Sequence, residues 1–388
     1  MNASTEPGRQ NEQQTPLRDL AASFLKLGSI AFGGPAAHIA LIEQEVVTRR
    51  GWVTQQEFLD FLGLSNLIPG PNSTEIAIYI GRQRRGWAGL LVAGLSFILP
   101  SSLMVAALAW AYVKYGALPQ IAGVLYGVKP VVIAVIAQAV FRLGKTALKS
   151  AWLISLCVAA TVAAALGVNG LLIFAIVGCV TALAFQIRSK KPIGRSAVML
   201  AGAGSVATTA AAPFSLKALF LVFLKIGAIL FGGGYVLLAF LRSNLVQGLG
   251  WISERQLLDA IAMGQVTPGP ISTAATFLGY ILGGFPGAVV ATVAIFLPAF
   301  VLVAITGPFV PQLRRSPLAA AVLDGINVAA LAVIVVVAWQ LGRSAVVDRI
   351  TLAIALLSGF ALIRYRLNSA WLVLVGAAAG MLSSVLVR

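Results

Sequence analysis

The stretch FLKLGSIAFGGPAAHIALIEQEVVTRRGWVTQQEFLD, Phe24 to Asp60, lies over FLKIGAILFGGGYVLLAFLRSNLVQGLGWISERQLLD, Phe223 to Asp259, without a gap. The two stretches are 199 positions apart, and 14 of the 37 aligned pairs are identical. At the same offset, Pro69-Gly70-Pro71-Asn72-Ser73-Thr74 falls on Pro268-Gly269-Pro270-Ile271-Ser272-Thr273. The chain is therefore a tandem duplication, and its repeats of about 170 residues are too long for solenoid units.

The composition places the chain in a lipid bilayer. Hydrophobic residues make up 59% of the 388 positions and charged residues 10%, and the mean hydropathy is +0.93. Soluble domains carry roughly 25% charged residues. Several apolar segments reach the roughly 20 residues that cross the hydrocarbon core as a helix. We therefore expect an all-α polytopic membrane protein, built from two homologous halves as many transporters are.

The distribution of charge follows membrane topology. The formal charge of +16 comes from 28 basic and 12 acidic residues, and many of the basic ones lie in short connections between apolar segments. This pattern obeys the positive-inside rule and does not indicate nucleic-acid binding. The main clusters of the first half are Arg82-Arg84-Arg85, Arg142-Lys145-Lys149 and Arg188-Lys190-Lys191-Arg195.

The sequence contains no signature of an enzyme. We find no phosphate-binding loop, no metal-ligand cluster and no nucleophile with a base and an acid. The single histidine and two cysteines are too few for most such sites. We therefore expect no catalytic residues, no metal and no cofactor, and transport powered by ATP on this chain is not supported.

The chain divides into a flexible polar tail (1–16), a first repeat (17–187), a linker that either crosses the membrane or connects loosely (188–213), and a second repeat (214–388). Each half offers six apolar segments, and Pro-Gly-Pro breaks the second of them in its middle. If the broken segment crosses, the chain has thirteen crossings, and if it re-enters, ten. In both cases the basic residues of the two halves follow different segments, which predicts inverted repeats.

The two Pro-Gly-Pro breaks are the strongest local signals for a site. Each is followed by Ser-Thr and an apolar stretch, which predicts a helix that starts inside the protein with Pro71 or Pro270 at its first position. Such a start presents backbone N–H groups, the positive end of the helix dipole and hydroxyls to an anion. A structural kink is the alternative, but two copies favour binding. The candidates are Pro69, Gly70, Pro71, Asn72, Ser73, Thr74, Pro268, Gly269, Pro270, Ser272 and Thr273.

Two further repeated features extend the candidate substrate site. The pairs Gly33-Gly34 and Gly232-Gly233 let backbone approach a ligand closely, or let helices pack closely. Lys26 and Lys225 lie in the same apolar segments. Each lysine either faces a polar cavity, where it attracts an anion, or extends to the membrane surface.

Four residues are candidates for coupling transport to protons. Asp60 and Asp259 repeat, whereas Glu75 becomes Ala274 in the second half and His38 has no counterpart. Acidic groups beside an anion path repel the substrate. They therefore pair with lysine, carry coupling protons or orient helices at an interface. His38 either relays protons or packs as a hydrogen-bonded side chain.

Together these motifs resemble the chromate ion transporter (CHR) family in its long form, in which two homologous halves are fused. The resemblance rests on Phe32-Gly33-Gly34-Pro35 with His38, on Gly51-Trp52-Val53 and Phe58-Leu59, and on the Pro-Gly-Pro stretches. It covers nearly the whole chain after the tail. It implies export of chromate across the bacterial inner membrane, driven by the membrane potential or a proton gradient, with sulfate as a tetrahedral look-alike.

The residues by themselves argue only for a carrier of a small inorganic oxyanion. A sulfate or other small-anion importer or exchanger fits them too, as does a non-transporting membrane protein. The broken helices favour transport, because a scaffold gains nothing from breaking its membrane helices twice. We expect a central site at the interface of the repeats, with access alternating as the two halves rock. A homodimer is compatible with the sequence.

Overall fold

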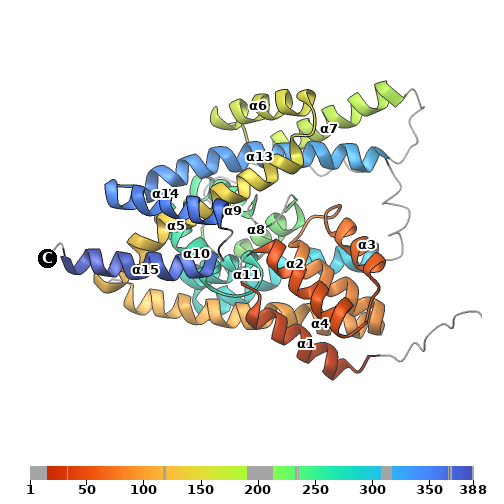
Figure 1. The fold of residues 1–388 in the computed structure, drawn as a ribbon, viewed down its shortest axis with the longest axis horizontal. Helices are drawn as coiled ribbons and strands as arrows, with labels where there is room; N and C mark the ends of the chain where they lie inside the picture. Colours follow the sequence, from red (N-terminus) through yellow and green to blue (C-terminus); the bar gives the residue numbers. More distant parts are fainter. Residues whose placement is uncertain are drawn as a thin grey trace, which may run out of the picture.

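The computed structural model describes residues 15–32, 34–116, 119–189, 213–231, 234, 236–306, 317–365, 367 and 369–386. Within these ranges the chain is helical and contains no strand (Figure 1), which confirms the expected all-α class. Positions 1–14 of the expected tail and 190–212 of the expected linker lie outside the described residues.

The two halves contain corresponding helices in the same order, and the second half has one additional short element, η4. The first half consists of α1 (Leu17–Ile30), α2 (Pro35–Glu43), η1 (Gln44–Arg49), α3 (Gln55–Ser65), α4 (Asn72–Tyr115), α5 (Pro119–Ala147), α6 (Ala151–Ala165) and α7 (Gly170–Ser189). The second consists of α8 (Leu216–Ala228), α9 (Val236–Leu241), η3 (Arg242–Gly248), α10 (Glu254–Val266), η4 (Ile271–Thr273), α11 (Ala274–Thr306), α13 (Pro317–Ala345), α14 (Arg349–Arg364) and α15 (Ser369–Leu386). The duplication is therefore structural as well as sequential.

α4 is two helices joined by a sharp reversal. Gly86 adopts φ 58°, a left-handed conformation that glycine adopts readily. The first arm spans residues 72–84 and is about half as long as the second arm, 87–115. The two arms are so close that a Cβ on Gly81 would overlap the backbone oxygen of Gly89 in the second arm. α11 repeats the reversal at Gly284, with φ 62°.

The segment broken at Pro-Gly-Pro returns to the end at which it enters. Gln83, at the end of the first arm of α4, donates to Glu57 at the start of α3, with Nε2 and Oε1 2.6 Å apart. α3 and this arm therefore run antiparallel, with Pro-Gly-Pro at the tip. The 11 residues of α3 extend about 16 Å, which is roughly half of the ~30 Å hydrocarbon core. The broken segment is a re-entrant hairpin.

The first apolar segment also turns back. Arg84 donates from Nε to Thr15 Oγ1 at 2.8 Å and from Nη1 to the Trp52 carbonyl at 3.2 Å. Thr15 precedes α1 and Trp52 follows η1, so these elements form a second hairpin, whose tip includes residues 31, 32 and 34. We call the end of the molecule where Thr15, Trp52 and Arg84 meet the first end.

These two hairpins bear on the count of crossings. Each half has six segments, as expected; in the described residues two of them turn back on themselves, and the other four are single helices or helix arms. By length and composition alone, five helices there could cross a membrane, namely α4, α5, α7, α11 and α13, while α6 and α15 are shorter apolar helices.

The second half is inverted relative to the first. Arg82, close to the reversal of α4, donates from Nη1 to the carbonyl of Val303 at 2.7 Å and to that of Ala304, both near the far end of α11. Conversely, Tyr112 near the far end of α4 stacks at a tilt on Phe277 in the first arm of α11, with ring centroids 5.2 Å apart. The second arms of α4 and α11 are thus antiparallel, and their reversals lie at opposite ends.

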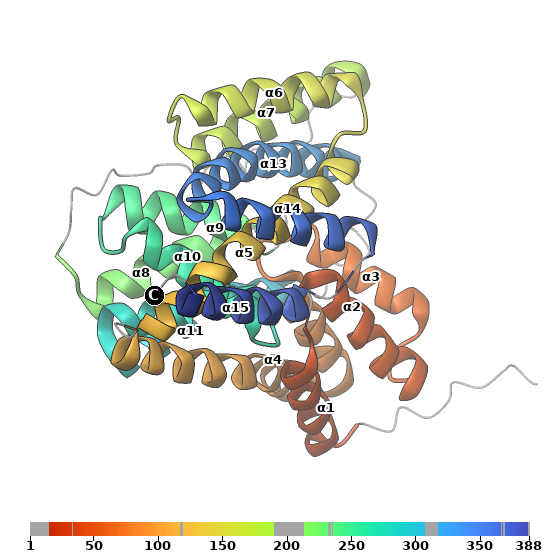
Figure 2. The same ribbon diagram turned by 60° about the vertical axis from the view of Figure 1, so that its left-hand side comes forward.

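The last helices of each half pack on the other half. α6 and α7 lie along α13, whereas α14 and α15 lie along α5 (Figures 1 and 2). Gly127 of α5 and Gly376 of α15 are in such close backbone contact that no Cβ fits between them. Asp348, which caps α14, accepts a hydrogen bond from Tyr126 of α5 at 2.5 Å. Hydrogen bonds from the Thr351 backbone and from Tyr126 hold the pKa of Asp348 below its usual range.

Two reciprocal backbone hydrogen bonds join the hairpin tips of the two halves. Gly70 N donates to Leu230 O at 2.9 Å, and Gly269 N donates to Ala31 O at 2.8 Å. The two bonds correspond in the duplication. Gly70 and Gly269 have φ values of +152° and +96°, which favour glycine. Because an unsatisfied backbone group in the membrane interior costs several kcal/mol, these bonds allow helices to break there.

We predict that Gly269→Ala destabilises the protein more than Gly167→Ala. Both glycines have positive φ, +96° and +87°, so both substitutions strain the backbone. Only at Gly269 would the new Cβ meet a side chain, Ser101 Cβ at 2.6 Å, and such overpacking costs about 1–3 kcal/mol more. Thermal unfolding of the purified protein in detergent measures the difference. Equal shifts of the two midpoints would contradict close packing at the tip.

We predict that Glu57→Ala loosens the first Pro-Gly-Pro hairpin and that Glu57→Gln does not. Glu57 forms a capping box with Thr54 and also binds Gln83, and in the second half Gln256 forms the same box with Ser253. Loss of a helix cap costs about 0.5–2 kcal/mol. Thermal unfolding and limited proteolysis compare the variants. If glutamine were as damaging as alanine, the charge and not the cap would be the stabilising feature.

Candidate functional site

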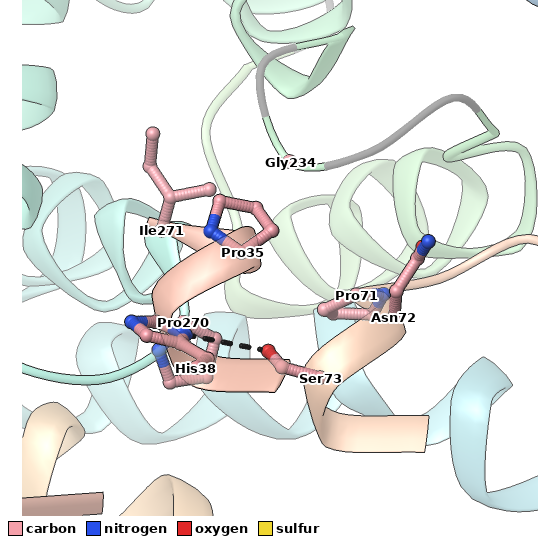
Figure 3. A pocket seen from close by; sticks show the side chains of 8 residues that line it. All are labelled: Pro35, His38, Pro71, Asn72, Ser73, Gly234, Pro270 and Ile271. Atoms are coloured by element: carbon pink, nitrogen blue, oxygen red, sulfur yellow. Dashed lines mark hydrogen bonds between the residues drawn. The ribbon is translucent and has the colours of Figure 1, made fainter. Parts of the chain in front are cut away.

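The four hairpin tips enclose a small central cavity (Figure 3). Its lining comes from both halves and consists of Pro35, His38, Pro71, Asn72, Ser73, Gly234, Pro270 and Ile271. The cavity has a volume of about 10 Å³, which is room for about one water molecule. A second cavity of about 10 Å³ adjoins it through His38 and Ile271, and its other lining residues are Gly34, Gly264, Gln265, Thr267 and Gly269.

The helix start at the first Pro-Gly-Pro differs from the expectation by one residue. Pro71 is extended, with ψ 100°, and its carbonyl accepts hydrogen bonds from the N–H groups of Thr74 and Glu75 at 2.8 and 3.1 Å. Pro71 is therefore the cap and not the first helical residue, and Pro270 likewise precedes η4. The N–H groups of Asn72 and Ser73 come before these first helical bonds, at the positive end of the helix. Both residues line the cavity.

The four hydroxyls of the two Ser-Thr pairs have different surroundings. Ser73 Oγ lies 3.4 Å from His38 Nδ1 in the cavity wall (Figure 3). Thr74 Oγ1 and Ser272 Oγ are buried and have no hydrogen-bond partner in the described residues. Thr273 Oγ1 donates to the Pro270 carbonyl at 2.8 Å, as the kink alternative expects. A buried unsatisfied polar group costs about 1–3 kcal/mol. Thr74 and Ser272 do not line the cavity themselves, but each follows a lining residue in the chain, Ser73 and Ile271, so both remain candidates for contact with a ligand.

The structure brings only some of the expected substrate residues to the cavities. Gly34, Pro71, Asn72, Ser73, Gly269 and Pro270 line them. Lys26 is exposed on α1 and Lys225 is half-buried on α8, and neither lysine lines a cavity. Gly33, Gly232 and Gly233 lie outside the described residues.

The two repeated aspartates have unequal partners. Asp259 is fully buried on α10, where it forms an ion pair with Lys129 of α5 at 2.9 Å and accepts a hydrogen bond from Tyr112 at 2.8 Å. It thereby connects the second half to the first. Asp60 is half-buried on α3 and accepts a hydrogen bond from Gln56 at 3.1 Å. Three roles were possible for Asp259: pairing with a lysine, carrying coupling protons or orienting helices. The contact with Lys129 matches the first of these.

The other two candidates for coupling lie close to the cavities. His38 is 3% exposed, packs edge-on against Phe97 with ring centroids 6.3 Å apart, and lines both cavities. Glu75 follows Ser73 and Thr74 in the first turn of α4 and is 0% exposed. Its two carboxyl oxygens have no hydrogen-bond partner among the described residues.

Four further residues with contacts in this region were not identified from the sequence. Lys129 is a lone lysine in the apolar segment of α5, which is itself a signal for a buried partner, and Tyr112 is a second donor to that partner. Gln265 and Thr267 line the second cavity. Gln265 aligns with Asn66 in the duplication, so a polar residue beside the break in both halves was the available signal.

The lining suits a small anion held by neutral groups. The polar side chains that line the two cavities are those of His38, Asn72, Ser73, Gln265 and Thr267, and no lining side chain belongs to a lysine, arginine, aspartate or glutamate. Hydroxyl, amide and imidazole groups donate hydrogen bonds, and helix starts bind anions through backbone N–H groups. Among the described residues, no cluster of three histidine, cysteine or acidic side chains could hold a metal ion.

Comparison with known proteins agrees with this architecture. The chain is 34% identical over 368 residues to the chromate transport protein of Cupriavidus metallidurans, which covers 93% of this chain and 92% of the relative. It is 34% identical over 352 residues to the probable chromate transport protein of Synechococcus elongatus, covering 88% of each. Identity to the chromate transport protein of Pseudomonas aeruginosa is 35% over 293 residues, 72% of this chain and 70% of the relative. No solved structure matches the chain significantly.

The family model described as chromate transporter matches the chain in two parts, residues 18–210 and 217–381. These parts correspond to the two halves that the duplication defines, and together they include both Pro-Gly-Pro hairpins. The relatives are transporters, and the described helices are those of a multi-pass membrane protein. The chain belongs to the chromate transporter family.

Proposed function

We propose that this protein is a secondary transporter that exports chromate across the inner membrane and thereby confers chromate resistance, driven by the membrane potential or a proton gradient. The observation that carries the proposal is the meeting of four broken helices from inverted halves at one cavity with neutral hydrogen-bond donors. Substrate sites of secondary transporters are formed by such discontinuous helices at the repeat interface. The names of the relatives favour chromate as the substrate.

In this proposal the oxyanion binds between the two helix starts. Asn72 and Ser73 offer backbone N–H groups, and the Ser73, Thr74 and Ser272 hydroxyls offer further donors. A tetrahedral oxyanion is larger than one water molecule, so the cavity has to widen before it binds. Separation of the hairpin tips, with loss of the bonds from Gly70 and Gly269, provides that widening. The described conformation is then a closed one.

The two repeated lysines have a more distant role in this scheme. Lys26 and Lys225 do not line the cavities, so they attract the anion towards the hairpins without contacting it there. Their charges act over a longer range than a hydroxyl does, and salt screens them over about 10 Å at 0.1 M ionic strength. Their contribution is therefore to the rate of entry more than to the strength of binding.

The charges of the connections indicate which end of the molecule faces the cytoplasm, and the membrane potential favours outward transport of an anion. Arg82, Arg84 and Arg85 lie at the first end, and α5 starts at the opposite end and runs back over 29 residues to bring its basic last turn there too. By the positive-inside rule the first end is cytoplasmic. A membrane potential that is negative inside favours export of anions by about 2.3 kcal/mol per charge at 100 mV. A dianion therefore gains about twice that.

Import or exchange of sulfate, or of another small anion, is the alternative. A lining of neutral donors recognises the shape and charge of a tetrahedral dianion, and chromate and sulfate share both. The geometry therefore favours sulfate as a competitor for the same site.

Formation of a homodimer belongs to the same proposal, and light scattering from the detergent-solubilised protein measures it.

We predict that inverted membrane vesicles containing the protein accumulate radiolabelled chromate when they are energised and not when they are de-energised. Accumulation in inverted vesicles corresponds to export from the cytoplasm, and excess sulfate should reduce it. Vesicles from cells with the empty vector are the control. Absence of accumulation in vesicles shown to contain folded protein would remove chromate export and leave the alternative anions and the opposite direction to be assayed.

We predict that Ser73→Ala and Thr74→Ala raise the KM for the oxyanion. Hydrogen bonds to charged groups contribute about 1.5–3 kcal/mol, so each lost hydroxyl that contacts the anion weakens binding about tenfold or more. Thr273→Ala is the matched control, because its hydroxyl is already satisfied by the Pro270 carbonyl and should affect KM less. A large KM effect of Thr273→Ala with none at Ser73 and Thr74 would contradict the assigned helix start.

The double variant Lys26→Gln, Lys225→Gln should lower oxyanion transport mainly at low salt, because salt screens the two charges.

A further inference from the structure

Glu75 is a buried carboxyl group without a partner at the first Pro-Gly-Pro tip. It is 0% exposed, and both of its oxygens have no hydrogen-bond partner among the described residues. A Cβ added to Gly70 would overlap Glu75 Oε1, so the carboxyl turns back from the first turn of α4 towards the tip. The group therefore lies at the same helix start that offers Asn72 and Ser73 to the cavity.

The surroundings of Glu75 contain little that could balance a negative charge. The buried cluster at this position consists of apolar residues from α3, the tip, both arms of α4 and α11, namely Leu64, Ile68, Ile78, Leu90, Ala299 and Val303, together with Tyr79. Tyr79, one turn further along the same arm, interacts electrostatically with Glu75, and its hydroxyl forms a hydrogen bond of 2.7 Å with Thr306 Oγ1. Arg82, which also interacts electrostatically with Tyr79, is engaged by carbonyls of α11.

An ionised carboxylate is strongly disfavoured in such a position, and the group takes a proton instead. We propose that Glu75 is the proton-binding site of the transporter, and that its proton travels with the oxyanion. This inference rests on the proposed function for the identity of the cargo. The proton-binding site itself rests on the buried, unpartnered carboxyl group.

Proton and anion binding are linked because they involve the same helix start. An ionised Glu75 repels an incoming anion and competes with it for the positive end of the helix, whereas a protonated Glu75 does neither. Protonation therefore favours anion binding, and the two move in the same direction. A divalent oxyanion that crosses with one proton carries one net negative charge, so a membrane potential that is negative inside drives its export, whereas an inward proton gradient opposes it. Of the two driving forces proposed above, this coupling therefore selects the membrane potential.

The other candidates fit this role less well. Asp259 already has a lysine and a tyrosine as partners, whereas Glu75 has none among the described residues. Asp60 is half-buried and hydrogen-bonded, and His38 contacts Ser73. Position 274, the counterpart of Glu75, is alanine, so the second helix start has no equivalent carboxyl group. The proposal therefore assigns a single proton site to the transporter, on the first helix start.

Infrared spectroscopy of the reconstituted protein tests the proton site without transport. The wild type should show the carbonyl band of a protonated carboxylic acid at neutral pH, and Glu75→Gln should lose it. Glu75→Gln keeps the size of the side chain and lacks the titrating group, and Glu75→Ala reproduces the residue found at position 274. Asp19→Asn, a partly exposed carboxylate on α1, is the control and should keep the band. Persistence of the band in Glu75→Gln would overturn the proposal.

Proteoliposomes that report both chromate flux and internal pH test the coupling. Wild-type protein should move protons with chromate, whereas Glu75→Gln should move chromate without protons and at a rate independent of pH. Continued proton movement in Glu75→Gln, or a dependence of the wild type on sodium in place of pH, would overturn the coupling role. If the wild type shows the infrared band but moves no chromate or sulfate, the proposed cargo fails and the proton site stands.

Discussion

The backbone hydrogen bonds between the hairpin tips are the constraint on which the rest of the structure depends. A helix that stops inside an apolar bilayer leaves N–H and C=O groups that neither water nor lipid can satisfy. Here Gly70 donates to Leu230 and Gly269 donates to Ala31, so each half satisfies the break in the other. The glycines at the tips and the antiparallel placement of the halves are both conditions for these two bonds. The cavities exist because the bonds hold four helix breaks together.

The duplication preserved this backbone arrangement more strictly than the side chains around it. The tips correspond residue by residue, yet Glu75 aligns with Ala274 and His38 aligns with Leu237 in the duplication. Asp259 has an ion pair with Lys129, whereas Asp60 bonds Gln56. With a symmetric backbone, the two inverted halves can exchange their conformations, which gives one conformation open to each side of the membrane. The unequal side chains are where the proposed coupling differs between the halves.

The sequence predicted the features that depend on residue type at fixed positions. The duplication, the Pro-Gly-Pro breaks and the opposite orientation of the halves follow from identity, proline chemistry and the distribution of basic residues. The return of the first segment was not predictable in the same way, because it depends on Arg84 reaching both Thr15 and Trp52. Lys26 was placed near the site by its sequence neighbours. In the helix, Phe24 and Leu27 form the buried face and Lys26 is exposed.

The exchange of helices between the halves has a consequence for how the molecule can move. α15 packs on α5 and α7 packs on α13, so each covalent half contributes to the packing of the other. Rigid rotation of residues 17–187 against 214–388 would separate both pairs and expose the close glycine contact between Gly127 and Gly376. Movement of the tip-bearing hairpins, within a frame built jointly from both copies, would leave both helix pairs in contact. The boundary of the gene duplication therefore does not coincide with a boundary in the packing.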